Sequence, residues 1–260
     1  MTATSLTGVR LGHFYELVVH LARRELSSQH RGTLLGWAWP LTRQLAQLAV
    51  LVFVFSSLFD LDIENYPVFV FTGLLAFGWF ASGVQAGSTC VLDQRHLIFQ
   101  PRFPAAAVPV VAVTVPLVDV LVALPVLVVM LIASGDIGWT AVLLPPLLVV
   151  QLTLMCGLAW LCGAATVYLR DVPNIVLVAV TLLFYMTPVF YDVSRVPERY
   201  QELFGLNPLA TLIECYRAVL IGSPWPSAWK IAFVVAAAGA ATVGGLMLFK
   251  RLQPGFVDEL

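Results

Sequence analysis

Residues 65–92, NYPVFVFTGLLAFGWFASGVQAGSTCVL, form an uninterrupted run of 28 uncharged residues, and this run decides the class of fold. A helix needs about 20 predominantly apolar residues to cross the hydrocarbon core of a bilayer, so the run is long enough to span a membrane. The composition of the whole chain agrees, because 60% of its 260 residues are hydrophobic and 11% are charged. Soluble domains are roughly a quarter charged, and the sequence therefore excludes a water-soluble globular fold.

Five further stretches of low charge reach spanning length. The sequence therefore predicts an all-α membrane protein with six transmembrane helices in a single domain over residues 1–260. The predicted spans are about 36–59, 67–89, 105–133, 139–168, 172–191 and 229–249. Pro109, Pro116 and Pro125 are expected to bend the third span.

The distribution of basic residues predicts the orientation in the membrane. An even number of spans places both termini on one side, and nine Lys and Arg residues fall on that side against four on the other. Because cytoplasmic loops carry an excess of Lys and Arg, both termini are predicted to be cytoplasmic, in a multi-pass protein of the cytoplasmic membrane. The first outer loop agrees, since it holds Asp60, Asp62 and Glu64 and no basic residue.

Residues 10–31 are predicted to form an amphipathic helix that lies in the plane of the membrane interface. Phe14, Leu17, Val18 and Leu21 recur at the helical spacing i, i+3, i+4 and i+7, with polar and basic residues on the other face. Such a helix either anchors the chain ahead of the first span or offers a surface to a partner.

The outer segment 192–228 is predicted to contain helices that re-enter the membrane or lie on its outer surface. Asn207 followed by Pro208 is typical of a helix N-terminus, and the helix is expected to end near Leu220. A helix of this length is about 21 Å long, too short for a hydrocarbon core of about 30 Å. Glu214 and Arg217 lie three residues apart and are expected to pair on one side of it.

The sequence lacks the side-chain patterns of an enzyme or a metal protein. None of the four histidines lies in a predicted span, Asp119 is the one acidic residue well inside a span, and the four cysteines have no C-x-x-C spacing. A membrane-embedded transferase would need a carboxylate or histidine cluster at a membrane face, so this class is disfavoured. With a net charge of −1, the chain also lacks the basic excess of a nucleic-acid-binding protein.

Energy for transport would have to come from a partner, because no phosphate-binding loop of the form G-x-x-x-x-G-K-[ST] is present. The loop 93–104 offers such a partner a foothold, since Arg95 and Arg102 flank the apolar residues Leu97, Ile98 and Phe99. The alternative is an ordinary connector whose apolar residues dip into lipid.

Four short stretches, in this order along the chain, resemble motifs of type 2 ABC exporter permeases for polysaccharides and teichoic acids. They are RELSSQHRGTLLGWAWP at 24–40, YLRDVP at 168–173, TPVFY at 187–191 and NPLATLIECYR at 207–217. The resemblance implies a homodimer joined to two copies of a separate ATP-binding subunit, which would hold ATP and Mg²⁺. Its cargo would be a lipid-linked polysaccharide, either O-antigen-like or a cell-wall galactan. A type 2 exporter of drugs or lipids is the alternative within the same superfamily.

The resemblance also assigns roles to residues. Contact with the ATP-binding subunit falls on the amphipathic helix and the loop 93–104, that is, on Arg23, Arg24, Arg95, Leu97, Ile98, Phe99 and Arg102. The outer gate falls on the region 192–228, with Asn207, Glu214, Tyr216 and Arg217 as its central residues.

One position departs from the family pattern, which usually has Gln-Pro after the tryptophans where this chain has Arg43-Gln44. The Arg43 side chain either snorkels to the inner headgroups or, together with Arg31, faces the entrance where a lipid pyrophosphate would arrive. The channel is expected to be lined by aromatic residues, which can stack on sugar rings. The candidates are Phe53, Phe55, Phe59, Phe80, Tyr185 and Phe190.

Overall fold

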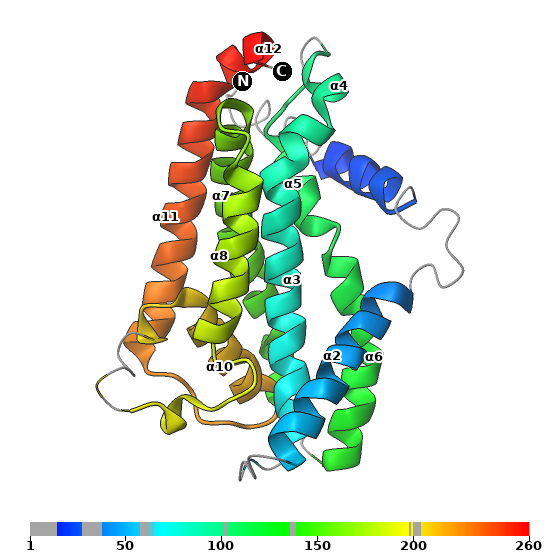
Figure 1. Cartoon of the computed structure of the whole chain (residues 1–260), viewed down its shortest axis with the longest axis vertical. Coiled ribbons are helices and arrows are strands. Elements are labelled where there is room, and N and C mark those ends of the chain that lie inside the picture. The colour runs from blue at the N-terminus through cyan, green and yellow to red at the C-terminus, as the bar shows by residue number, and fades with distance from the viewer. Residues whose placement is uncertain are drawn as a thin grey trace, which may run out of the picture.

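The computed structural model describes residues 15–27, 38–57, 63, 65–100, 103–135, 139–197, 199 and 204–259. Within these ranges all regular structure is helical, and the helices form one elongated bundle (Figure 1). The predicted all-α class is therefore confirmed.

Five segments are long and apolar enough to cross a membrane. They are α2 (Ala38–Ser57), α3 (Tyr66–Asp93), the pair α5 (Ala107–Thr114) and α6 (Leu117–Ser134), α7 (Leu144–Tyr168) with the 3-10 turn η1 (Trp139–Leu143) before it, and α11 (Ala228–Leu252) with the C-terminal segment after it. The third span is interrupted at Pro116, between α5 and α6, whereas Pro125 lies inside α6. The bend predicted at Pro116 is thus a break between two helices.

The predicted span 172–191 contains only a shorter apolar helix, α8 (Val172–Met186). Its 15 residues cover about 22 Å at about 1.5 Å per residue. The helix ends because Thr187 precedes Pro188 and adopts an extended backbone, with φ −112° and ψ 137°. The boundary predicted at Tyr191 was therefore wrong, and the last five residues of that range form a separate return of the chain.

Helix α3 lies at the centre of the bundle, with α7, α5, α10 (Pro208–Leu220), α2, α6 and α8 packed around it (Figure 1). Because it has neighbours on most sides, its side chains are predominantly apolar, and Val70 and Phe71 are completely buried. A polar side chain of a neighbouring helix also binds a backbone carbonyl of α3. Gln151 of α7 donates to the carbonyl of Ala76 at 2.8 Å.

Helices α7 and α11 pack backbone against backbone. A Cβ atom added to Gly245 would overlap the carbonyl oxygen of Gly157, so neither position leaves room for a side chain. Thr242 of α11 also donates to the carbonyl of Thr153 at 2.8 Å. Small residues at such a contact let two membrane helices approach closely.

The helix of residues 15–27, the short helix α4 (Arg95–Ile98) and the C-terminal helix α12 (Phe256–Glu259) gather at one end of the bundle (Figure 1). Helix α10 and the last turns of α2 and α6 lie toward the other end. The first and last of the described helices therefore lie at the same end of the bundle. Which end faces the cytoplasm stays a prediction.

Candidate functional site

An open groove runs between α2 and α8, with α3 as its floor. It consists of two adjoining cavities of about 340 Å³ and about 470 Å³, which share the lining residues Gln47, Phe184 and Tyr185. Gly78, Ala81 and Ser82 line the first cavity along α3. Small side chains at these positions leave space between the two walls.

Aromatic rings in contact with one another follow this groove. The ring of Phe184 lies 5.2 Å from that of Phe77 and 5.7 Å from that of Phe190, measured between centroids. The series continues from Phe190 to Phe55 at 5.0 Å and to Tyr191 at 5.1 Å. We call these five residues and the adjoining Tyr185 the aromatic series. Rings in such arrangements support one another and keep apolar faces in fixed positions.

The structure brings three of the six predicted channel residues together in the groove, namely Phe55, Tyr185 and Phe190. Phe80 does not line the groove, because only 5% of it is exposed and it packs on Phe77 in the core. Phe53 is exposed on α2 but lines neither cavity, and Phe59 lies outside the described residues.

Sequence reasoning missed Phe184 and Gln47, which line both cavities. No pattern in the sequence distinguishes Phe184 from the other residues of that span, because the side of α8 that lines the groove is decided by packing against α2 and α3.

The return segment, residues 187–191, connects the end of α8 to the segment before α10 and is held by two side chains of the α10 motif. Asn207 donates to the hydroxyl oxygen of Thr187 at 3.0 Å, while its own side-chain oxygen accepts from the backbone N–H of Leu209 at 3.0 Å. Arg217 donates through Nη2 to the carbonyl of Val189 at 2.7 Å. The predicted N-cap at Asn207 is confirmed, and the same residue also binds the end of α8.

Arg217 is the most deeply buried charged side chain of the described residues, with 3% of its surface exposed. Its Nη2 lies 3.4 Å from the carbonyl oxygen of Phe69, and its guanidinium carbon lies 3.4 Å from the centroid of the Phe69 ring. Carbonyl oxygens and an aromatic face therefore replace water around this cation. We call Arg217, Asn207 and the return segment the outer latch, because they lie in or next to the segment 192–228 that the sequence predicts to lie on the outer side.

A glycine allows the return segment to approach α3. A Cβ atom on Gly73 would lie 2.7 Å from the carbonyl oxygen of Val189 and 3.1 Å from Nη2 of Arg217. Tyr66, two turns earlier on α3, donates to the carbonyl of Phe190 at 2.9 Å. The motifs at 187–191 and 207–217, separate in the sequence, thus meet on one side of α3.

The predicted pair of Glu214 with Arg217 was wrong. Arg217 points inward to α3, and Glu214 instead forms an ion pair with Lys230 of α11, at 3.7 Å and with each side chain 21% exposed. Burial raises the pKa of the Glu214 carboxyl above its usual value, and the charge of Lys230 opposes this shift. Tyr216 is buried and lines a small cavity together with residues of α3 and α6.

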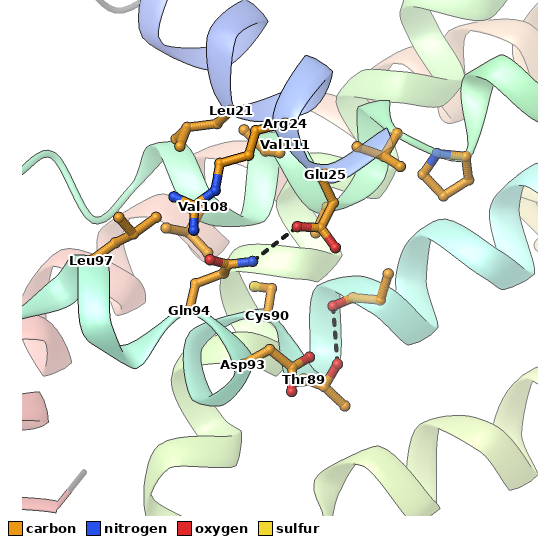
Figure 2. A pocket seen from close by; sticks show the side chains of 14 residues that line it. Leu21, Arg24, Glu25, Thr89, Cys90, Asp93, Gln94, Leu97, Val108 and Val111 are labelled. Atoms are coloured by element: carbon orange, nitrogen blue, oxygen red, sulfur yellow. Dashed lines mark hydrogen bonds between the residues drawn. The ribbon is translucent and has the colours of Figure 1, made fainter. Parts of the chain in front are cut away.

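At the opposite end of the bundle, the helix of residues 15–27 packs beside the end of α3 (Figure 2). The side-chain amide of Gln94 donates to a carboxylate oxygen of Glu25 at 3.1 Å, and a cavity of about 180 Å³ lies between these elements and α5. Of the predicted contact residues, Arg24 and Leu97 line this cavity.

The other predicted contact residues are placed differently. Arg23 and Arg95 are exposed, Ile98 is half-buried, and Phe99 is 48% exposed, whereas Leu97 is buried. Of the three apolar residues predicted to contact the partner, Phe99 is therefore the exposed one. Arg102 and Arg31 lie outside the described residues, and Arg43 lines the groove.

The sequence is similar to that of known proteins over nearly the whole chain. The sequence model of the family described as ABC-2 type transporter matches residues 16–221. The chain is 30% identical over 247 residues to the O-antigen export system permease protein RfbA of Myxococcus xanthus, covering 94% of this chain and 95% of that protein. It is 26% and 24% identical to two proteins of the same name from Klebsiella pneumoniae, with 96% of this chain and 97% of each relative covered.

Proposed function

The chain belongs to the ABC-2 type transporter family, and from this premise we propose that it is the permease subunit of an ATP-driven exporter of a lipid-linked polysaccharide of the O-antigen type. Two copies of the chain would assemble with two copies of an ATP-binding subunit, which would hold ATP and Mg²⁺. The chain itself is the transport component, and hydrolysis takes place on the partner.

The groove is the observation that carries this proposal. A polysaccharide needs a path that tolerates many sugar units in succession, and stacking on aromatic faces binds sugar rings with few fixed hydrogen bonds. The aromatic series provides such faces from the last turn of α8 to the return segment. Polar side chains on α2 and α3 supplement them at the other end of the groove.

The outer latch fits the role of an outer gate. The return segment carries Phe190 and Tyr191 of the aromatic series, and its carbonyl groups are bound by Arg217 and Tyr66. Any movement of α10 relative to α3 would therefore shift these rings. In this proposal the latch holds the outer end of the path in its resting position.

The helix of residues 15–27 and α4 are proposed to face the ATP-binding subunit on the cytoplasmic side. The hydrogen bond between Gln94 and Glu25 joins these elements, so a push on one is transmitted to the end of α3. The exposed Phe99 is the apolar side chain best placed to enter a partner's surface. Both termini would then be cytoplasmic.

The proposal is tested by deleting the gene in its native host and following the polysaccharide. We expect the glycan to disappear from the outer face and its lipid-linked form to accumulate inside, with recovery on expression of the wild-type chain. Phe184→Ala should restore export poorly, and Phe53→Ala, at an exposed aromatic position outside the groove, serves as the matched control.

Normal surface glycan in the deletion strain, together with the loss of resistance to a drug or a change in membrane lipids, would instead assign the chain to the export of small amphiphiles.

A further inference from the structure

Polar side chains from three helices converge in the first cavity of the groove. Arg43, Gln44 and Gln47 come from α2, Ser82 from α3 and Thr181 from α8. The cavity measures about 340 Å³, large enough for several ordered groups of a ligand. We call it the polar pocket.

The polar pocket lies beside the middle of α3 and is open on one side. Gln94, which binds Glu25 of the helix of residues 15–27, follows Ser82 by 12 residues, a rise of about 18 Å along the helix axis of α3. Arg43 is exposed and lines the pocket beside Gly78 and Ser82, so it lies well away from the level of the helix of residues 15–27. The position therefore supports the second alternative for Arg43, a charge that faces a cavity, because charged residues within membrane spans pair with a counter-charge or line a polar path.

Gln44 supplies an independent sign of a missing ligand. Only 6% of it is exposed, yet its side-chain Oε1 has no hydrogen-bond partner within the described part of the chain. Buried polar atoms almost always have a partner, so an unpaired acceptor on a side chain that lines a cavity points to a bound group. Gly78 lets the Gln44 amide approach α3 closely, since a Cβ atom there would lie 3.1 Å from Nε2 of Gln44.

We infer that the polar pocket binds an oxyanion of the exported substrate through Arg43 and an adjacent sugar hydroxyl through Gln44. This inference rests on the proposed function and deepens it. A guanidinium matches the paired oxygens of a phosphate or carboxylate, and the carboxamide oxygen accepts from a hydroxyl. The pocket shares Gln47, Phe184 and Tyr185 with the second cavity, so the sugars that follow would lie against the aromatic series.

The oxyanion has two possible sources, the diphosphate that links the glycan to its lipid and an acidic sugar of the glycan. Binding measurements separate them. The purified complex of permease and ATP-binding subunit, in nanodiscs of phosphatidylcholine, is titrated with farnesyl diphosphate, with farnesol and with a glucuronic-acid disaccharide.

For a diphosphate site, Arg43→Gln should weaken the binding of farnesyl diphosphate about ten- to hundredfold, the loss of one charge-assisted hydrogen bond or slightly more. Arg43→Lys should give an intermediate affinity, because it keeps the charge and loses the planar fork. Farnesol should bind equally to all variants. Arg251→Gln is the matched control, because it removes the same charge at an exposed position at the end of α11.

An effect of Arg43→Gln on the disaccharide alone would support the inference with the acidic sugar as the source. Equal affinity of the wild type and Arg43→Gln for both anions would overturn it. The proposed function is judged separately by surface glycan, so a wild-type complex that exports glycan while its pocket binds no anion refutes this inference alone.

Discussion

Replacing Arg217 by methionine should open the outer latch while the protein still inserts. The substitution removes a charge-assisted hydrogen bond of 2.7 Å to Val189 and a stacked contact of 3.4 Å on Phe69. Such a hydrogen bond contributes about 1.5–3 kcal/mol and a desolvated cation–π contact up to about 2 kcal/mol. Part of this is offset because a buried charge no longer has to be desolvated, so we expect a net loss of about 2–4 kcal/mol in the attachment of the return segment.

Two measurements check this expectation, the amount of glycan that reaches the outer face at normal permease abundance and the Tm of the purified complex. Arg217→Met should lower both, and Arg217→Lys should lower them less. Exchanging Glu214 and Arg217 should not rescue export, because the exchange places a carboxylate against the carbonyl oxygens of Val189 and Phe69. Rescue by this exchange, or full export by Arg217→Met, would show that the latch described above does not hold the outer end of the path.

Three further predictions compare variants with different expected outcomes. Gly73→Ala should reduce export several-fold by displacing the return segment, whereas Gly239→Ala, where a Cβ meets nothing within 4 Å, should export normally; surface glycan measures both. Phe99→Ser should uncouple transport from ATP hydrolysis with little change in Tm, because that side chain is exposed. Leu97→Ser should lower the free energy of unfolding by about 2–5 kcal/mol, because that side chain is buried. Measurements of the ATPase rate and of Tm distinguish the two effects. Burial raises the folded-state pKa of Glu214, so ionisation of its carboxyl lowers stability as pH rises above the usual pKa of 4.5. Glu214→Gln should therefore raise Tm at neutral pH and lose this advantage in acid. A difference in Tm between the variant and the wild type that does not change with pH would contradict the burial argument.

The membrane class and the approximate spans could be predicted from the sequence because they depend on local composition. The end of α8 shows where this information stops. Hydropathy continues through Val189 and Phe190, but the extended backbone before Pro188 ends the helix at Met186. A residue that precedes proline disfavours helical backbone, so Thr187 and Pro188 mark this boundary in the sequence.

The partners of individual side chains could not be predicted, because they depend on elements far apart in the chain. Glu214 and Arg217 share a helix and were expected to pair, yet one binds Lys230 and the other binds carbonyls 28 and 148 residues away. Likewise, the sequence of the loop 93–104 shows that apolar residues lie between two arginines. It does not show that Leu97 is buried and Phe99 exposed.

The backbone contact between α7 and α11 divides the bundle into a rigid frame and a movable wall. Helices that touch through Gly157 and Gly245 cannot slide past each other without steric overlap, and α3 is packed tightly against α7. Helix α2 forms the opposite wall of the groove, and only 11% of its apolar window is buried. Widening of the groove should therefore come from α2, which directly follows the interface region in the chain. Spin labels on α7 and α11 should keep a constant separation through the ATP cycle while those on α2 and α3 change theirs, and the opposite pattern would assign the motion to the frame.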